Sequence, residues 1–341
     1  MKIVNQKIFT IFFIALMVSI IFIPTYQSSC LDILDIKKID HSRIINEGID
    51  IISGKQSNNK NYNLLKLTDW FNSQPMIEFA SLVETSITIK FKDGAYGVIL
   101  DPRGFNGDNN YKANLGQIES NQDGKTALIL NPAAYAYGNA QCRKIINILV
   151  KKGYNIKYFE NQDVDLPLVR HNFTEEIIYM NTHAGYWDID GDGNGDTVVI
   201  ATGEYWTENT PDLYEFEYEN QMIVRGIVGE KSFVAFTPAF IDYYYEPGNM
   251  SNSLVYMATC HATYDDSMAN VFLDAGASVF VGWEGYTVFW TNSMTSVKAF
   301  RLLRLNLPIK LVCNIIRYGG LYNFLFRSKL IYFGDGNYKI S

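Results

Sequence analysis

The sequence predicts an α/β fold, in which a mostly parallel sheet is flanked by helices and preceded by a smaller β-containing segment. From residue 126 onward, short apolar runs typical of buried strands alternate with amphipathic helical runs. Before that point, Ser86 to Leu100 alternates apolar and polar residues around Asp93-Gly94, which predicts a β-hairpin. With 341 residues, the chain can build a sizeable core in one large domain or two moderate ones.

The first 29 residues predict export from the cytoplasm. Lys2 and Lys7 precede an apolar run over residues 8–23, which Pro24 ends. This run is slightly shorter than the roughly 20 residues of a comfortable membrane span. We expect residues 1–29 to be either a cleaved signal peptide or a retained N-terminal membrane anchor. The protein would then be secreted or held at the cell surface.

Charge and cysteine content argue against two classes of protein, those that bind nucleic acids and those built on disulfide bonds. The net charge is −7 and no continuous basic stretch occurs, which argues against a nucleic-acid partner. The four cysteines, Cys30, Cys142, Cys260 and Cys313, form no C-x-x-C pair and are too few for a disulfide framework in a chain of this length. We expect at least one of them to stay a free thiol for a reason other than packing.

Residues 30–125 are expected to form a separate N-terminal segment. Residues 31–60 are polar and rich in Asn, as in a linker, and residues 104–125 resemble a loop. With the hairpin between them, this segment is either an inhibitory propeptide or a supporting β-subdomain. The main domain then covers residues 126–341.

Within the main domain, strands and helices are expected in alternation. Candidate strands lie at residues 126–132, 154–160, 175–185, 195–203, 232–240, 253–262 and 277–285, and candidate helices at 139–153, 265–276, 294–305 and 309–318. His183 and Cys260 each follow an apolar strand. Because chemistry in such sheets gathers beyond the carboxyl ends of the strands, we expect these two side chains to meet.

A thiol beside an imidazole is a candidate nucleophile, because the imidazole favours the reactive thiolate. A helix that begins near Asp265 would add its dipole and backbone N–H groups. Each residue alone has a plainer interpretation, Cys260 as a small buried apolar side chain and His183 as a structural residue. His261 adjoins Cys260, but successive residues leaving a strand point in different directions, so we assign it to the loop.

Two blocks of sequence, "IIYMNTHAG" and "LVYMATCHAT", resemble the caspase-like (clan CD) cysteine peptidases, especially the exported, gingipain-type branch. The later "MANVFLDAGASVFVGW" and "YFGDGN" are similar to blocks that follow the nucleophile in that family. The resemblance covers about residues 126–340. It implies a caspase-haemoglobinase-like fold, with Cys260 as the nucleophile and His183 as the general base and acid.

The resemblance also implies an oxyanion hole from backbone N–H groups near Gly185 and Cys260. The family often has Gly directly after the His, whereas here Ala184 precedes Gly185. Relatives that cut after Arg or Lys often carry an acidic residue two positions before the Cys, where this chain has Ala258. Glu284, past the next strand, is the candidate substitute in the substrate pocket.

An acidic ladder follows His183 and predicts a calcium site. Oxygen side chains alternate here with Ile189 and three glycines, at Asp188, Asp190, Asp192, Asn194 and Asp196. Ca²⁺ takes six to eight oxygen ligands, and the glycines let the backbone curl around an ion. Val199 stands where an EF-hand has its bidentate Glu. The alternative is a solvated acidic turn; with calcium bound, the loop would be held beside the substrate cleft.

These observations predict an exported cysteine endopeptidase with a Cys–His dyad, a structural calcium loop and a protein or peptide substrate. A second interpretation is a catalytically inactive caspase-like protein that acts as a surface or binding protein. A third is a metal-dependent hydrolase that uses His183, His261 and Asp188, although no H-E-x-x-H or similarly tight ligand spacing occurs.

Overall fold

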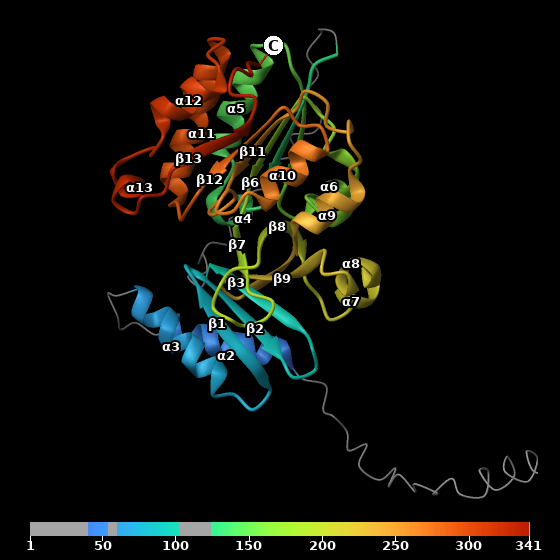
Figure 1. Ribbon diagram of the computed structural model, residues 1–341, viewed down its shortest axis with the longest axis vertical. Coiled ribbons are helices and arrows are strands. Elements are labelled where there is room, and N and C mark those ends of the chain that lie inside the picture. Colours follow the sequence, from blue (N-terminus) through green and yellow to red (C-terminus); the bar gives the residue numbers. More distant parts are fainter. Residues whose placement is uncertain (1–39, 54–59, 102–123, 341) are drawn as a thin grey trace, which may run out of the picture. The chain divides into compact units, whose positions relative to one another are not determined.

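The computed structural model describes residues 40–53, 60–101 and 124–340 (Figure 1). The predicted signal peptide or anchor, Cys30 and residues 104–123 of the predicted loop at 104–125 lie outside these residues. In the described part of the chain, no helix is both long and apolar enough to cross a membrane. Residues His41–Ser341 form one compact unit.

A six-stranded sheet carries most of the predicted parallel strands, which confirms the α/β class. Its order is β5 (Asn155–Glu160), β4 (Thr126–Asn131), β6 (Ile177–Asn181), β11 (Leu254–Ala258), β12 (Val279–Trp283) and β13 (Leu330–Gly334). All neighbours are parallel except the unpredicted edge strand β13, which runs antiparallel to β12.

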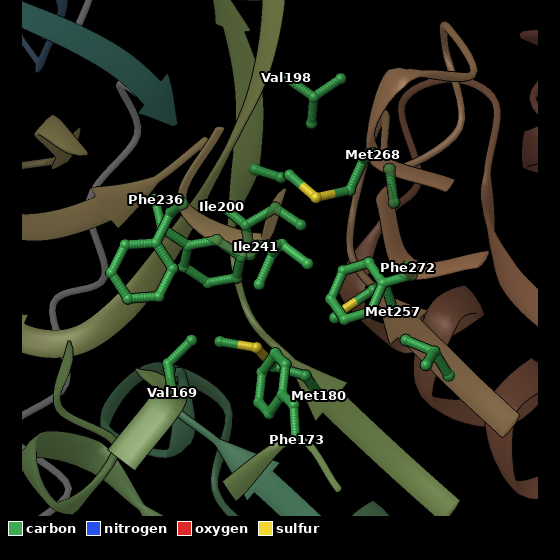
Figure 2. Close-up of a cluster of buried hydrophobic side chains, with 14 of the residues drawn as sticks. Val169, Phe173, Met180, Val198, Ile200, Phe236, Ile241, Met257, Met268 and Phe272 are labelled. Atoms are coloured by element: carbon green, nitrogen blue, oxygen red, sulfur yellow. The ribbon is translucent and has the colours of Figure 1, made fainter. Parts of the chain in front are cut away.

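Helices cover both faces of this sheet, which explains why its strands are apolar without interruption. One face packs on α5 (Ala140–Val150), α11 (Phe289–Arg304) and α12 (Ile309–Ile316). The other packs on α6 (Leu166–Asn172), α9 (Pro238–Tyr244) and α10 (Ser267–Asp274) (Figure 1). In β11, Tyr256 belongs to the first core and Met257 to the second, where it lies beside Phe272 (Figure 2).

A second, seven-stranded sheet was not predicted as such. Its order is β1 (Ile77–Val83), β2 (Ser86–Phe91), β3 (Tyr96–Asp101), β9 (Ile223–Val228), β10 (Lys231–Phe236), β8 (Thr197–Tyr205) and β7 (Ala184–Trp187). Only the β3–β9 pair is parallel. The predicted hairpin is confirmed as β2–β3. Because β1–β3 share this sheet with β7–β10, residues 77–101 and 184–236 build one structure across the expected boundary at residue 125.

The two sheets meet through a common apolar core. Val198, Ile200 and Phe236 of the seven-stranded sheet lie in one cluster with Met180 and Met257 of the six-stranded sheet (Figure 2). This packing holds the strands β7–β10 against β6 and β11, the strands that precede His183 and Cys260.

The predicted linker at 31–60 is wrong for residues 41–53, which form helix α2 (His41–Ser53). Ile44, Ile45 and Ile49 are buried at helical spacing, so an apolar stripe outweighs the polar composition. Helix α3 (Lys60–Asn72) follows and packs on β1. The remaining short elements are α4 (Ala134–Tyr137), η1 (Asn161–Asp163), α7 (Thr210–Leu213), α8 (Glu215–Glu219) and α13 (Leu321–Leu325).

Candidate functional site

His183 and Cys260 line one cleft at the carboxyl edge of the six-stranded sheet. Strands β6 and β11 are adjacent and parallel, and their last paired residues are Asn181 and Ala258. His183 and Cys260 each follow two residues later, so they leave neighbouring strands at the same level. The cleft has a volume of about 180 Å³ and is lined by Leu100, Asp101, Tyr137, Asn181, Thr182, His183, Ala184, Thr259, Cys260, Tyr286, Thr287, Val288, Phe289 and Asn292.

The Cys260 thiol is the accessible one among the cysteines that the structure describes. It is half-buried, whereas Cys142 and Cys313 are buried. Burial raises the pKa of the Cys313 thiol to about 12 and raises that of Cys142 further. The Cys260 Sγ lies 3.4 Å from the Thr287 backbone N–H and 3.3 Å from the Thr287 carbonyl oxygen. The Thr287 N–H donates to the sulfur, and the Thr287 carbonyl oxygen accepts from the thiol S–H.

The helix that begins at this cleft is α11, not the helix predicted near Asp265. Helix α10 starts at Ser267, where Asp265 accepts the Ser267 backbone N–H at 3.0 Å, and none of its residues lines the cleft. Thr287, Val288 and Phe289 lead from the Cys260 sulfur directly into α11. The positive end of the α11 dipole therefore lies on the cleft side.

Two stacked aromatic rings line the cleft, and one of them lies next to His183. Tyr137 lies 5.5 Å from the His183 ring, between ring centroids, and stacks on Phe289 at 3.8 Å with only 7° between the planes. Sequence reasoning missed both aromatic residues, because neither belongs to a motif and they are far apart in the chain. The nearest signal was their position directly beyond a predicted strand and before a predicted helix.

A chain of buried amides, which we call the amide network, ties the strand ends together beneath the cleft. It consists of Asn131 at the end of β4, Asn181 at the end of β6 and Asn292 on α11. Asn181 donates to Asn131 Oδ1 at 2.7 Å, and Asn292 donates to the Ala258 carbonyl at 2.8 Å and to Asn181 Oδ1 at 3.5 Å. Trp283 Nε1 donates to Asn292 Oδ1 at 2.9 Å. The network thus joins the strand before His183 to the strand before Cys260.

His261 points away from the cleft, as expected for the residue after Cys260. Its backbone is left-handed, with φ +57°, and its buried ring lies 4.7 Å from the Tyr186 ring. Its Nε2 is 3.2 Å from Thr85 Oγ1 in the β1–β2 turn. Burial lowers the pKa of His261 to about 4, so the ring is neutral at physiological pH.

The structure does not bring Gly185 or Glu284 into the cleft lining. Gly185 lies in β7, where a Cβ atom would meet Ser86 Oγ at 2.3 Å, so close packing of β7 on β2 requires glycine here. Glu284 forms a salt bridge of 3.3 Å with Lys329. The carboxylate that does line the cleft is Asp101, the buried last residue of β3, which sequence reasoning missed.

The acidic ladder lies at the far end of β7 from His183 and packs on β1 and β2, not beside the cleft. Asp188 is buried and accepts hydrogen bonds from Ser81 Oγ and from the Gly191 and Gly193 backbone N–H groups. At about 3.4 Å per residue, Asp188 is roughly 17 Å along the chain from His183. The predicted contact between this loop and the substrate cleft is therefore wrong.

Three of the five predicted calcium ligands converge. Carboxylate oxygens of Asp188, Asp190 and Asp196 lie within 4.8 Å of one another. Asp192 and Asn194 instead bond to each other, with the Asn194 backbone N–H 2.7 Å from Asp192 Oδ1. These hydrogen bonds from Asn194 lower the pKa of Asp192.

No histidine joins this carboxylate group, which is the one cluster of metal-ligand type found among the described residues. His261 lies instead at Thr85, and His183 lies in the cleft. The interpretation as a metal hydrolase built on His183, His261 and Asp188 therefore has no support in the geometry.

A scan against models of known protein families finds no match, and neither does a search of curated protein sequences.

Proposed function

We propose that this protein is an exported cysteine endopeptidase of caspase-like fold, with Cys260 as the nucleophile and His183 as the general base and acid. One observation carries the proposal. A half-buried thiol and an imidazole leave adjacent parallel strands at the same level and line the same cleft. The succession that the resemblance implies is also present, as β6 and His183, β11 and Cys260, then α10 and β12.

In the proposed reaction, His183 takes the thiol proton and the Cys260 sulfur attacks the carbonyl carbon of the scissile peptide bond. His183 then donates the proton to the leaving amine, which departs and leaves a thioester on Cys260. Water, deprotonated by His183, hydrolyses the thioester and regenerates the thiol. The backbone N–H groups around Thr287 and the start of α11 are the candidate donors to the oxyanion, in place of Gly185.

Cleavage of a library of quenched fluorescent peptides tests this proposal. We expect Cys260→Ala and His183→Ala to abolish turnover, and the matched variants Cys313→Ala and His261→Ala to retain at least part of it. If all four variants cleaved as the wild type does, the dyad would be refuted. If the wild type cleaved nothing while Cys260 still reacted with alkylating agents, the protein would be an inactive caspase-like binding protein.

We further propose that the acidic ladder binds Ca²⁺ through Asp188, Asp190 and Asp196. Their convergence supports this site, and the buried Asp188 supplies an anchored carboxylate. The ion would stabilise the β7–β8 turn against β1 and β2. Calcium titration followed by calorimetry of the full-length protein is the direct measurement, with magnesium as the comparison ion.

A further inference from the structure

Positive charge is segregated within this acidic protein. Residues 139–153 and 285–334 contain 11 of the 29 Lys and Arg residues and none of the 36 carboxylates. The remaining 18 cations share the rest of the chain with all 36 carboxylates, so the rest carries a net charge of −18. The cations are spread along helices, which is why no continuous basic stretch is visible in the sequence.

The fold gathers these two stretches on one face of the six-stranded sheet, where α5, α11 and α12 lie together (Figure 1). A groove of about 380 Å³ runs between α5 and α11. Four exposed cations line it, Lys144, Lys151, Arg301 and Arg304. Within the described residues, none of these four forms a salt bridge.

The same face carries an unusual share of exposed apolar side chains. Of the 17 large hydrophobic residues that are exposed in the described part of the chain, nine lie between residues 290 and 326. Trp290 and Met294 follow each other by one helical turn on α11, and Leu311 and Ile315 do so on α12. The others are Leu305, Leu321, Phe324, Leu325 and Phe326.

We propose that this basic face, formed by the outer sides of α5, α11, α12 and α13, binds the surface of an anionic lipid bilayer. The interface of such a bilayer accepts both kinds of side chain. Aromatic and aliphatic groups enter the boundary between headgroups and acyl chains, while Lys and Arg reach the phosphates. Anionic lipids also supply the negative potential that complements the cations of this face.

Other occupants fit these observations less well. A second copy of the chain, docked face to face, would set four groove cations against four. A nucleic acid would use the cations but leave the exposed aliphatic residues of α12 and α13 without a partner. The proposal does not depend on peptidase activity, and its test does not measure it.

Fluorescence quenching in the full-length protein tests the proposal at one residue. Vesicles are made from phosphatidylcholine with brominated acyl chains, with or without phosphatidylglycerol. Of the five tryptophans, Trp290 lies on the basic face with 57% of its surface exposed. Residues 1–29 contain no tryptophan, so quenching does not report that apolar segment. We expect quenching that grows with the anionic lipid fraction, weakens with salt and largely disappears in Trp290→Phe.

Two quadruple variants with equal net charge separate the face from the charge of the whole protein. One replaces the groove cations by Gln, at Lys144, Lys151, Arg301 and Arg304. The control replaces four cations away from this face by Gln, the exposed Arg43, Lys66 and Lys92 and the half-buried Lys231 of β10. Because one cation near an anionic surface contributes about fivefold in partition, we expect the loss of four cations to weaken binding of the groove variant to such vesicles by roughly 600-fold. The control should bind nearly as the wild type does.

Three outcomes would overturn the proposal. They are equal losses in the two quadruple variants, quenching that is independent of anionic lipid, and quenching that persists unchanged in Trp290→Phe. Tight binding of a DNA or RNA duplex without vesicle binding would assign the face to a nucleic acid instead. Melting temperatures of all variants, measured in parallel, establish that the substitutions leave the fold intact.

Discussion

Replacing Asn292 by Ala should impair both stability and turnover, because this side chain connects the two strands that present the dyad. It accepts from Trp283 Nε1 and donates to the Ala258 carbonyl, two residues before Cys260. It also reaches Asn181, two residues before His183. With Ala at this position, the fully buried indole N–H of Trp283 has no acceptor.

The size of the effect follows from these contacts. A buried donor left unsatisfied costs about 1–3 kcal/mol, and the volume vacated by the amide adds a further penalty. We therefore expect Asn292→Ala to lower the free energy of unfolding by about 2–4 kcal/mol. Since a misplacement of about 1 Å can reduce the rate roughly 100-fold, kcat/KM should fall by a similar factor well below the melting temperature.

Gln141→Ala is the matched control for this prediction. Gln141 is equally buried and its Nε2 donates to the Tyr179 hydroxyl, but it does not line the cleft. It should lose stability without losing turnover. Denaturant unfolding, peptide cleavage and the alkylation rate of Cys260 are compared across the wild type and both variants. If Asn292→Ala were destabilised while its kcat/KM and its Cys260 alkylation rate stayed at wild-type values, the amide network would be only structural.

Three further predictions concern titration and metal binding. At neutral pH, iodoacetamide should modify Cys260 before Cys313, whose pKa is raised to about 12 by burial; mass mapping that finds the reverse order would contradict the assignment. Burial lowers the pKa of His261 in the folded protein to about 4, so the unfolded chain binds a proton at this residue more readily than the folded chain. As the pH falls from about 6.5 to 4, the free energy of unfolding should therefore decrease by up to about 1.4 kcal/mol per pH unit. His261→Gln should flatten this dependence of the free energy of unfolding on pH, measured by chemical denaturation. The same pH dependence in the variant and the wild type would disprove this prediction. Calcium at a hundredfold excess over its dissociation constant should stabilise the fold by about 2.7 kcal/mol. Asp196→Asn should abolish the rise in melting temperature on adding calcium. Asp192→Asn should keep it, because the Asp192 carboxylate bonds to Asn194 instead. Equal calcium responses in the two variants would refute the site.

The strands that carry the dyad could be predicted because each is buried on both faces and therefore reads as an unbroken apolar run. The second sheet could not be assembled in the same way. Strand β9 has Arg225 at its centre, and its partner β3 lies more than a hundred residues earlier in the chain. Arg225 is accommodated by hydrogen bonds to Ser232 and Ser42, which no local pattern reveals. The same holds for Asp101, which ends β3 and pairs with Val228 of β9.

The second sheet also changes what calcium is expected to do. After His183 the chain leaves the parallel sheet to form β7–β10 and returns at β11, in a register that sets His183 level with Cys260. The Ala201 N–H of β8 donates to the His183 carbonyl at 2.9 Å, so pairing with β8 fixes His183 at the start of β7. The acidic ladder lies at the opposite end of β7. An ion there would act on His183 only through a strand that is already paired with β8 and packed on β2. Removing calcium should therefore lower the melting temperature and leave kcat nearly unchanged at temperatures where the protein stays folded. A large loss of kcat on chelation, with the fold intact by circular dichroism, would show instead that the loop couples to the cleft.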